Sequence, residues 1–191
     1  MLFYLLIFSV SLIATLLLTP VVRFFACKFK ILDKPALRKI HLKPIPRLGG
    51  AAIYLGFLVA ILVGYFTAHL FSVKVGVFPL VDILITSTIL VLVGILDDIN
   101  GTVHFVKLLF QVIVASLVIY LGIQIDFINN PFNGVFHLGL LAIPITIIWI
   151  TGITNAINLI DGLDGLASGV AAIAAFTLFV VALKLNMGGA A

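Results

Sequence analysis

The sequence has 191 residues, of which 63% are hydrophobic and only 9% are charged, and its formal net charge is +4. Soluble domains average about 25% charged residues, so this chain cannot present a water-facing surface all round and must face lipid over most of it. The positive charge does not indicate a nucleic-acid partner, because it is concentrated in one segment. A single cysteine, Cys27, excludes an intrachain disulfide.

Six apolar stretches approach or reach the roughly 20 residues that a membrane-spanning helix needs. They cover residues 1–22, 49–70, 79–96, 106–122, 138–157 and 166–183. Each is expected to be a helix, because lipid cannot satisfy open backbone polar groups. The sequence therefore predicts an all-α, polytopic transmembrane bundle of about six helices, in a single domain that covers residues 1–191.

The basic residues predict how this bundle is oriented. Eight of the eleven Lys and Arg residues lie between the first two stretches: Arg23, Lys28, Lys30, Lys34, Arg38, Lys39, Lys43 and Arg47. Loops rich in Lys and Arg stay in the cytoplasm, which puts the N-terminus outside. The connections after the third and fifth stretches are then cytoplasmic. The connection over residues 123–137 is external, and its Asn133-Gly134 dipeptide favours a small β-hairpin.

The basic loop ends in a segment that could receive a phosphate. Pro44 and Pro46 favour extended backbone, and Gly49-Gly50 open the second helix. The N-terminus of a helix offers unpaired N–H groups and a positive dipole end to an anion. Arg47 and His41 precede it in the sequence. Membrane topology and anionic lipid headgroups can also explain these charges.

Two pairs of acidic residues lie at the predicted cytoplasmic ends. All seven acidic residues are Asp, and four form two close pairs, Asp97/Asp98 and Asp161/Asp164. Charges near a bilayer are costly, so their presence is a hypothesis of function. Asp97 and Asp98 can attract a cation or a proton, and Lys107, near the start of the fourth helix, can neutralise phosphate. Alternatively, the Asp pair only ends a helix and the lysine snorkels to the interface.

A second polar segment follows the fifth stretch. Asn155, Asn158, Asp161 and Asp164 recur every three residues, and Gly162 and Gly165 are expected to break the helix so that the set converges. Carboxylate and amide oxygens are hard ligands that suit Mg²⁺. Helix capping explains one or two such residues, but not four at regular spacing.

Three segments together, RKIHLKPIPRLGG, GILDDINGTVHFVKLLFQ and NAINLIDGLDGLASG, resemble the polyprenyl-phosphate N-acetylhexosamine-1-phosphate transferases of glycosyltransferase family 4. The resemblance runs from about residue 33 to the C-terminus. It implies a multi-pass enzyme of the cell membrane with a cytoplasmic active site. Such an enzyme transfers a sugar-1-phosphate from a UDP-N-acetylhexosamine to undecaprenyl phosphate or another polyprenyl phosphate, and UMP leaves. This is the first membrane step in making a cell-envelope polysaccharide.

The resemblance also implies roles for individual residues. Asp97 and Asp98 match a pair that positions or deprotonates the lipid phosphate, and Asp161 and Asp164 match a second catalytic acidic pair. Mg²⁺, with Mn²⁺ as an alternative, is expected at Asn158 and Asp161. The residues expected to bind substrate are Lys107, Asn155, Arg47, Gly49, Gly50 and His41. The PIPRLGG segment looks more like the N-acetylglucosamine branch than the muramoyl-pentapeptide branch.

The sequence departs from the family in lacking its later Gly-Asp-x-Gly-Ser motif, whose Asp is a metal ligand. We therefore expect an incomplete N-terminal fragment of a larger transferase. Two other hypotheses remain: a cation-coupled transporter, whose ion the acidic clusters bind, and an inactive membrane fragment. The positions of the acids at helix ends, away from the midplane, argue against the transporter. A homodimer is one option for the oligomeric state.

Overall fold

The computed structural model describes residues 2–33, 43–73, 77–129, 134–162 and 165–185. Six α-helices dominate this part of the chain: α1 Leu2–Lys28, α2 Gly49–Thr67, α3 Val77–Asn100, α4 His104–Tyr120, α5 Ala142–Ile160 and α6 Leu166–Lys184. A 3-10 helix, η1 (Ala68–Phe71), extends α2, and a second one, η2 (Gly139–Leu141), precedes α5. The prediction of an all-α bundle of about six helices is confirmed.

Length and hydropathy mark most of these helices as membrane spans. Five helical segments of the described chain are long and apolar enough to cross a membrane, and α4, with 17 residues, is a shorter apolar helix. A helix of that length is about 26 Å long, which is at the lower limit for a span. Large apolar side chains on the helices are widely exposed, as at Leu16, Phe57 and Ile173. This exposure is expected of surfaces that face lipid.

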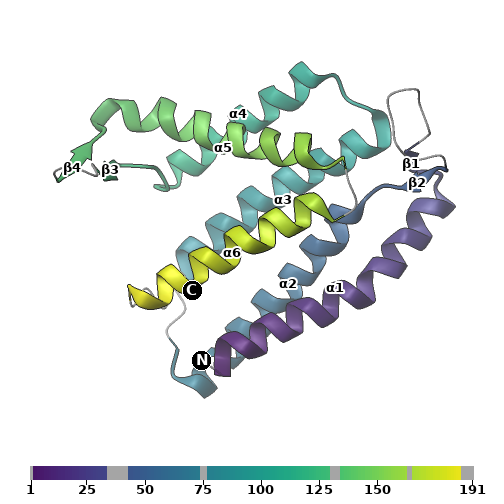
Figure 1. Ribbon diagram of the computed structural model, residues 1–191, viewed down its shortest axis with the longest axis horizontal. Coiled ribbons are helices and arrows are strands. Elements are labelled where there is room, and N and C mark those ends of the chain that lie inside the picture. Colours follow the sequence, from purple (N-terminus) through teal and green to yellow (C-terminus); the bar gives the residue numbers. More distant parts are fainter. Residues whose placement is uncertain (1, 34–42, 74–76, 130–133, 163–164, 186–191) are drawn as a thin grey trace. The chain divides into compact units, whose positions relative to one another are not determined.

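The chain divides into two compact units. The first comprises Met1–Gly76 and Val91–Thr102, and the second comprises Val77–Leu90 and Val103–Ala191. Each contains one closely packed pair of helices, α1 with α2 in the first unit and α4 with α5 in the second (Figure 1). The single transmembrane domain over residues 1–191 remains a prediction.

Helix α2 packs against α1 through a face of small residues. The buried residues of α2 are Ala52, Gly56, Ala60 and Gly64, which recur every four residues along one face. In lipid, helices associate through such faces, because small side chains let the backbones approach closely. A Cβ atom placed on Gly56 would lie 2.0 Å from Thr15 Oγ1 and 3.1 Å from the Thr15 backbone nitrogen. A side chain at position 56 would therefore require Thr15 to shift.

Gly56→Ala is expected to destabilise the protein by about 2 kcal/mol, because overpacking at a site that cannot expand costs that order of energy. Gly152→Ala is the matched control, since a Cβ atom at that helical glycine would meet nothing within 4 Å. Thermal unfolding of both variants in detergent checks this expectation. A melting temperature for Gly56→Ala no lower than that of Gly152→Ala would contradict the close approach.

In the second unit, α4 and α5 pack through faces that carry polar residues. Gln111, Val114 and Ala115 are buried on α4, and Thr146 and Thr151 are buried on α5. The Thr146 hydroxyl donates to the Ala142 carbonyl at 2.7 Å and accepts from the Ile125 backbone N–H at 2.9 Å. This second bond ties the segment after α4 to the first turns of α5.

Two short strand pairs accompany the helices. Strands β3, Phe127–Asn129, and β4, Val135–His137, pair antiparallel between α4 and α5, which confirms the predicted hairpin. Its external location remains a prediction, and Asn133 lies outside the described residues. The other pair, β1 (Leu32–Asp33) and β2 (Ile45–Pro46), was not predicted. It brings together the two ends of the basic loop, immediately before α2.

Candidate active site

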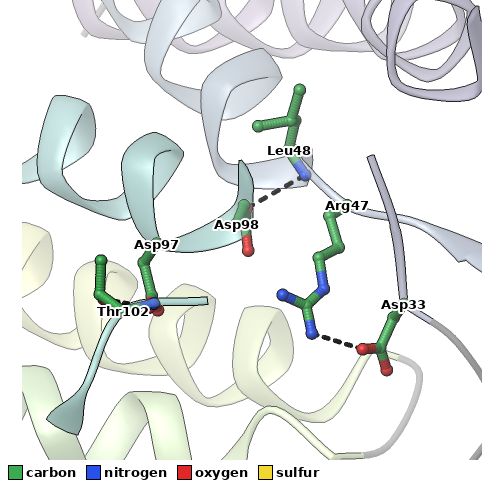
Figure 2. A network of polar contacts seen from close by, with 6 residues as sticks. All are labelled: Asp33, Arg47, Leu48, Asp97, Asp98 and Thr102. Carbon is green, nitrogen blue, oxygen red and sulfur yellow. Dashed lines mark hydrogen bonds and ion pairs between the residues drawn. The ribbon is translucent and has the colours of Figure 1, made fainter. Parts of the chain in front are cut away.

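The first unit contains a group of polar contacts that we name the Asp98 cluster: Asp33, Arg47, Leu48, Asp97, Asp98 and Thr102 (Figure 2). These residues come from β1, from the segment between β2 and α2, from the end of α3 and from the turn that follows it. The sequence placed Asp97 and Asp98 in a loop, but α3 continues to Asn100 and holds both in its last turn. Gly101, with φ of 66°, ends the helix with its N–H bonded to the Asp97 carbonyl at 2.8 Å.

Asp98 lies at the N-terminus of α2. Its Oδ2 atom accepts a hydrogen bond of 3.2 Å from the backbone N–H of Leu48, the residue that precedes the helix (Figure 2). Leu48 has φ of 73° in the left-handed region, which most residues avoid. Asp98 thus helps to satisfy the start of α2, where backbone N–H groups have no partner in the helix.

Gly49 and Gly50 leave the same helix start uncovered. Both residues are exposed, and a Cβ atom on either would meet nothing within 4 Å. Packing does not explain why both positions are glycine. In the described part of the chain, their N–H groups donate to no protein acceptor, so they can donate to an anion. The phosphate-binding role expected for these residues remains a prediction.

Asp97 is held differently from its neighbour. Its Oδ1 atom accepts from the Thr102 backbone N–H at 3.1 Å and also from the Thr102 hydroxyl. Both bonds close the turn between α3 and α4 around a single carboxylate oxygen. Of the two residues, Asp97 therefore has the clearer structural role, and Asp98 is the one that lies at the exposed start of another helix.

Arg47 forms an ion pair with Asp33 across the β1–β2 pair (Figure 2). The Arg47 backbone N–H also donates to the Ile31 carbonyl at 3.1 Å. These contacts fix the residue immediately before Leu48 and so fix how the chain enters α2. Sequence reasoning gave Arg47 a role toward phosphate and did not find its partner, Asp33.

The second unit contains another polar group between α4 and α5, which we name the Lys107 cluster: Lys107, Gln111, Thr151, Asn155 and Asn158. Lys107 Nζ donates to Asn158 Oδ1 at 2.6 Å, and Asn155 Nδ2 donates to Gln111 Oε1 at 2.7 Å. Lys107 and Gln111, one turn apart on α4, thus contact Asn158 and Asn155, one turn apart on α5. The structure brings together Lys107, Asn155 and Asn158, three of the residues that the resemblance implied for the site.

Gln111 is the residue of this cluster that sequence reasoning missed. It is 2% exposed and lies in a helix that is otherwise almost wholly apolar. A buried amide costs free energy unless it is hydrogen-bonded. Its spacing of four residues from Lys107 was the available signal, because that spacing puts both side chains on the same face of a helix.

Asp161 follows directly after α5. The helix ends at Ile160, and α6 begins at Leu166 after Gly165, whose φ is 78°. The glycines therefore interrupt the helix as predicted. Asp161 is exposed, one turn beyond Asn158. Asp164 and His41, the two other residues expected in the site, lie outside the described residues.

The donors fit part of a Mg²⁺ site. Mg²⁺ in phosphate-binding enzymes is held by one or two carboxylates, and water and substrate phosphates complete its shell. The Asp161 carboxylate and the Asn158 amide oxygen are donors of this kind, although that amide oxygen also accepts from Lys107. Within the described ranges, no three His, Cys, Asp or Glu residues gather as a complete metal site.

Comparison with known proteins identifies the family of this chain. The family model of glycosyl transferase family 4 matches residues 80–191. Over 148 residues the chain is 41% identical to a probable undecaprenyl-phosphate N-acetylglucosaminyl 1-phosphate transferase of Bacillus subtilis (strain 168). This alignment covers 76% of this chain and 38% of that protein. Over 123 residues it is 30% identical to the decaprenyl-phosphate N-acetylglucosaminephosphotransferases of Mycolicibacterium smegmatis and Mycobacterium leprae.

Those 123 residues are 64% of this chain, and 30% and 31% of the two mycobacterial proteins. The chain thus spans well under half the length of the relatives it matches. No solved structure matches it significantly. The matched family region, which begins at residue 80, contains Asp97, Asp98 and the whole Lys107 cluster. On the strength of that match, this chain belongs to glycosyl transferase family 4.

Proposed function

We propose that the protein transfers N-acetylglucosamine-1-phosphate from a UDP-sugar to a polyprenyl phosphate such as undecaprenyl phosphate. An oxygen of the lipid phosphate attacks the β-phosphorus of the donor. The bond from that phosphorus to the bridging oxygen breaks, and UMP leaves with the bonding electrons. A lipid-linked diphosphate sugar forms, as the first membrane step of cell-envelope polysaccharide synthesis. The observation that carries the proposal is the contact between Lys107 Nζ and Asn158 Oδ1 in a chain of this family.

The Lys107 cluster suits the diphosphate of the donor. Lys107 is a half-buried residue whose ammonium group donates to Asn158 on the neighbouring helix. In phosphoryl transfer most of the catalysis is charge neutralisation and positioning. We assign Lys107 to the phosphate oxygens of the donor, and Asn155 to the nucleotide-sugar on the adjacent turn of α5.

The Asp98 cluster suits the lipid phosphate. The N–H groups of Gly49 and Gly50 offer donors to a phosphate, and Asp98 lies beside them at the same helix start. We assign to Asp98 the role of accepting the proton of the attacking phosphate oxygen. Asp97 holds the α3–α4 turn through its hydrogen bonds with Thr102. Arg47, fixed by Asp33, adds positive charge at this helix start.

A Mg²⁺ ion, or Mn²⁺ in its place, would be held by Asp161 and Asn158, with Asp164 as a further candidate ligand. When bound, it would neutralise charge on the donor diphosphate. Asp161 supplies an exposed carboxylate immediately after α5, and Asn158 supplies an amide oxygen that Lys107 already orients. The protein groups thus prepare two of the oxygen donors that such an ion prefers.

We place the protein in the cell membrane with the active site in the cytoplasm. Lys and Arg are concentrated in the segment before α2, and such loops remain on the cytoplasmic side. Membership of a transferase family favours this function over the cation-coupled transporter that the sequence left as an alternative. A homodimer stays a prediction.

Membranes that contain the full-length gene product test the proposal. Supplied with UDP-N-acetylglucosamine, undecaprenyl phosphate and Mg²⁺, they are expected to release UMP, and release should stop when the lipid phosphate or Mg²⁺ is left out. Ion flux in liposomes without lipid substrate, together with no UMP, would favour the transporter. UMP release that does not depend on lipid phosphate would contradict the proposed acceptor.

A further inference from the structure

We infer that Gln111 is a positioning residue, which turns the amide of Asn155 so that its carbonyl oxygen accepts a hydrogen bond from a neutral donor group of the sugar nucleotide. This inference rests on the proposed function and adds to it. Gln111 ends the GILDDINGTVHFVKLLFQ segment, and none of the roles that the resemblance implies falls on it. The residue lies on α4, opposite Asn155 on α5, within a single compact unit.

The hydrogen bonds of Asn155 determine which way its amide faces. Its Nδ2 atom donates to Gln111 Oε1 at 2.7 Å and to the Thr151 carbonyl at 2.8 Å. An amide nitrogen carries two hydrogens, so both are used. The Oδ1 atom, by contrast, has no protein donor among the described residues. Asn155 is half-buried, so part of the residue is accessible to a ligand.

Gln111 is the part of this arrangement that packing does not require. It is 2% exposed, between apolar neighbours on the face of α4 that packs on α5. An apolar side chain of similar size would bury the same surface without the cost of desolvating an amide. The glutamine instead supplies a hydrogen-bond acceptor, Oε1, to the NH₂ group of Asn155. This bond favours one of the two orientations of the Asn155 amide. The Thr151 carbonyl favours the same orientation, and Gln111 adds the second acceptor that holds it.

The chemistry of a carbonyl oxygen identifies the class of group it binds. It is an acceptor with partial negative charge, so it does not bind phosphate oxygens and suits a hydroxyl or an amide or imide N–H. The anionic part of the ligand has its own partner in Lys107, four residues before Gln111. Side chains one helical turn apart are separated by about 5–6 Å at their Cβ atoms. A hydroxyl or N–H group of a nucleotide sugar can reach Asn155 from a phosphate bound at Lys107.

Gln111→Met keeps the volume of the side chain and removes the acceptor. It is expected to raise the KM for UDP-N-acetylglucosamine about 10-fold, which corresponds to one misplaced hydrogen bond, and to leave the KM for the lipid phosphate unchanged. Val114→Ala is the structural control, because Val114 is 1% exposed in the same interface and makes no polar contact. It should lower the melting temperature without changing either KM.

A double-mutant cycle tests whether Gln111 acts through Asn155. If it does, the double variant Gln111→Met/Asn155→Ala should have the same donor KM as Asn155→Ala alone. A donor KM in the double variant equal to the product of the two single fold-changes would overturn the inference. An unchanged donor KM in Gln111→Met would also overturn it. In both cases UMP release by the wild type would still uphold the transferase function. No UMP release by the wild type would overturn the proposed function, and the inference with it.

Discussion

Asp98→Asn is expected to reduce UMP release by about 1,000-fold, because a general base contributes a factor of that order and Asn cannot accept the proton. The fold should be retained, since the amide oxygen of Asn can still accept the 3.2 Å hydrogen bond from the Leu48 N–H. Initial rates of UMP release in membranes, normalised to the amount of protein, measure the effect. The loss should be in kcat, with little change in the KM for the donor.

Asp126→Asn is the matched control for that experiment. Asp126 is an exposed carboxylate beside the β3–β4 hairpin, where it accepts from Gln124 at 2.8 Å. The same chemical change there should leave the rate within a factor of about two, as is usual for surface substitutions. A fully active Asp98→Asn variant would remove Asp98 from the chemistry and leave it only the role of satisfying the start of α2.

Lys107→Gln is expected to lower kcat/KM for the UDP-sugar by about 10- to 100-fold, because hydrogen bonds to charged groups are worth about 1.5–3 kcal/mol. The variant keeps a polar side chain that can still bond to Asn158, so α4 and α5 should remain paired. Kinetics at varied donor concentration measure the effect. Lys107→Arg retains the charge and should recover part of the loss.

Lys184→Gln controls for a change of net charge alone. Lys184 is an exposed lysine in the last turn of α6, and no contact ties it to either cluster. Its replacement should leave kcat/KM unchanged. If Lys107→Gln were equally silent, Lys107 would be a snorkelling lysine, which was the alternative that the sequence left.

Hydropathy predicted the helices because lipid imposes a simple rule on them. Any apolar stretch long enough to cross the bilayer must satisfy its backbone internally, and a helix does so. Helix ends were less well predicted, because polar contacts determine them. Asp97 and Asp98 were expected in a loop, but the bonds from Thr102 and Gly101 to Asp97 close the turn only after Asn100.

The parts of the site that depend on one helix face were predictable. Asn155 and Asn158, three residues apart, share a face of α5, and both contact residues of α4. Contacts between distant segments were not predictable from a single sequence. The Asp33–Arg47 ion pair depends on a strand pair of two residues, too short for any pattern, and Gln111 is a single polar residue that only the packing of α4 on α5 distinguishes.

The fate of the β-phosphate tests the central claim most directly. Membranes with the full-length gene product would receive undecaprenyl phosphate, Mg²⁺ and UDP-N-acetylglucosamine that carries radioactive phosphorus at the β-position. The account predicts that the label enters the organic phase with the lipid, and that unlabelled UMP appears in equal amount. Label that remains in water as UDP while the sugar reaches the lipid, or no labelled lipid at all, would contradict it.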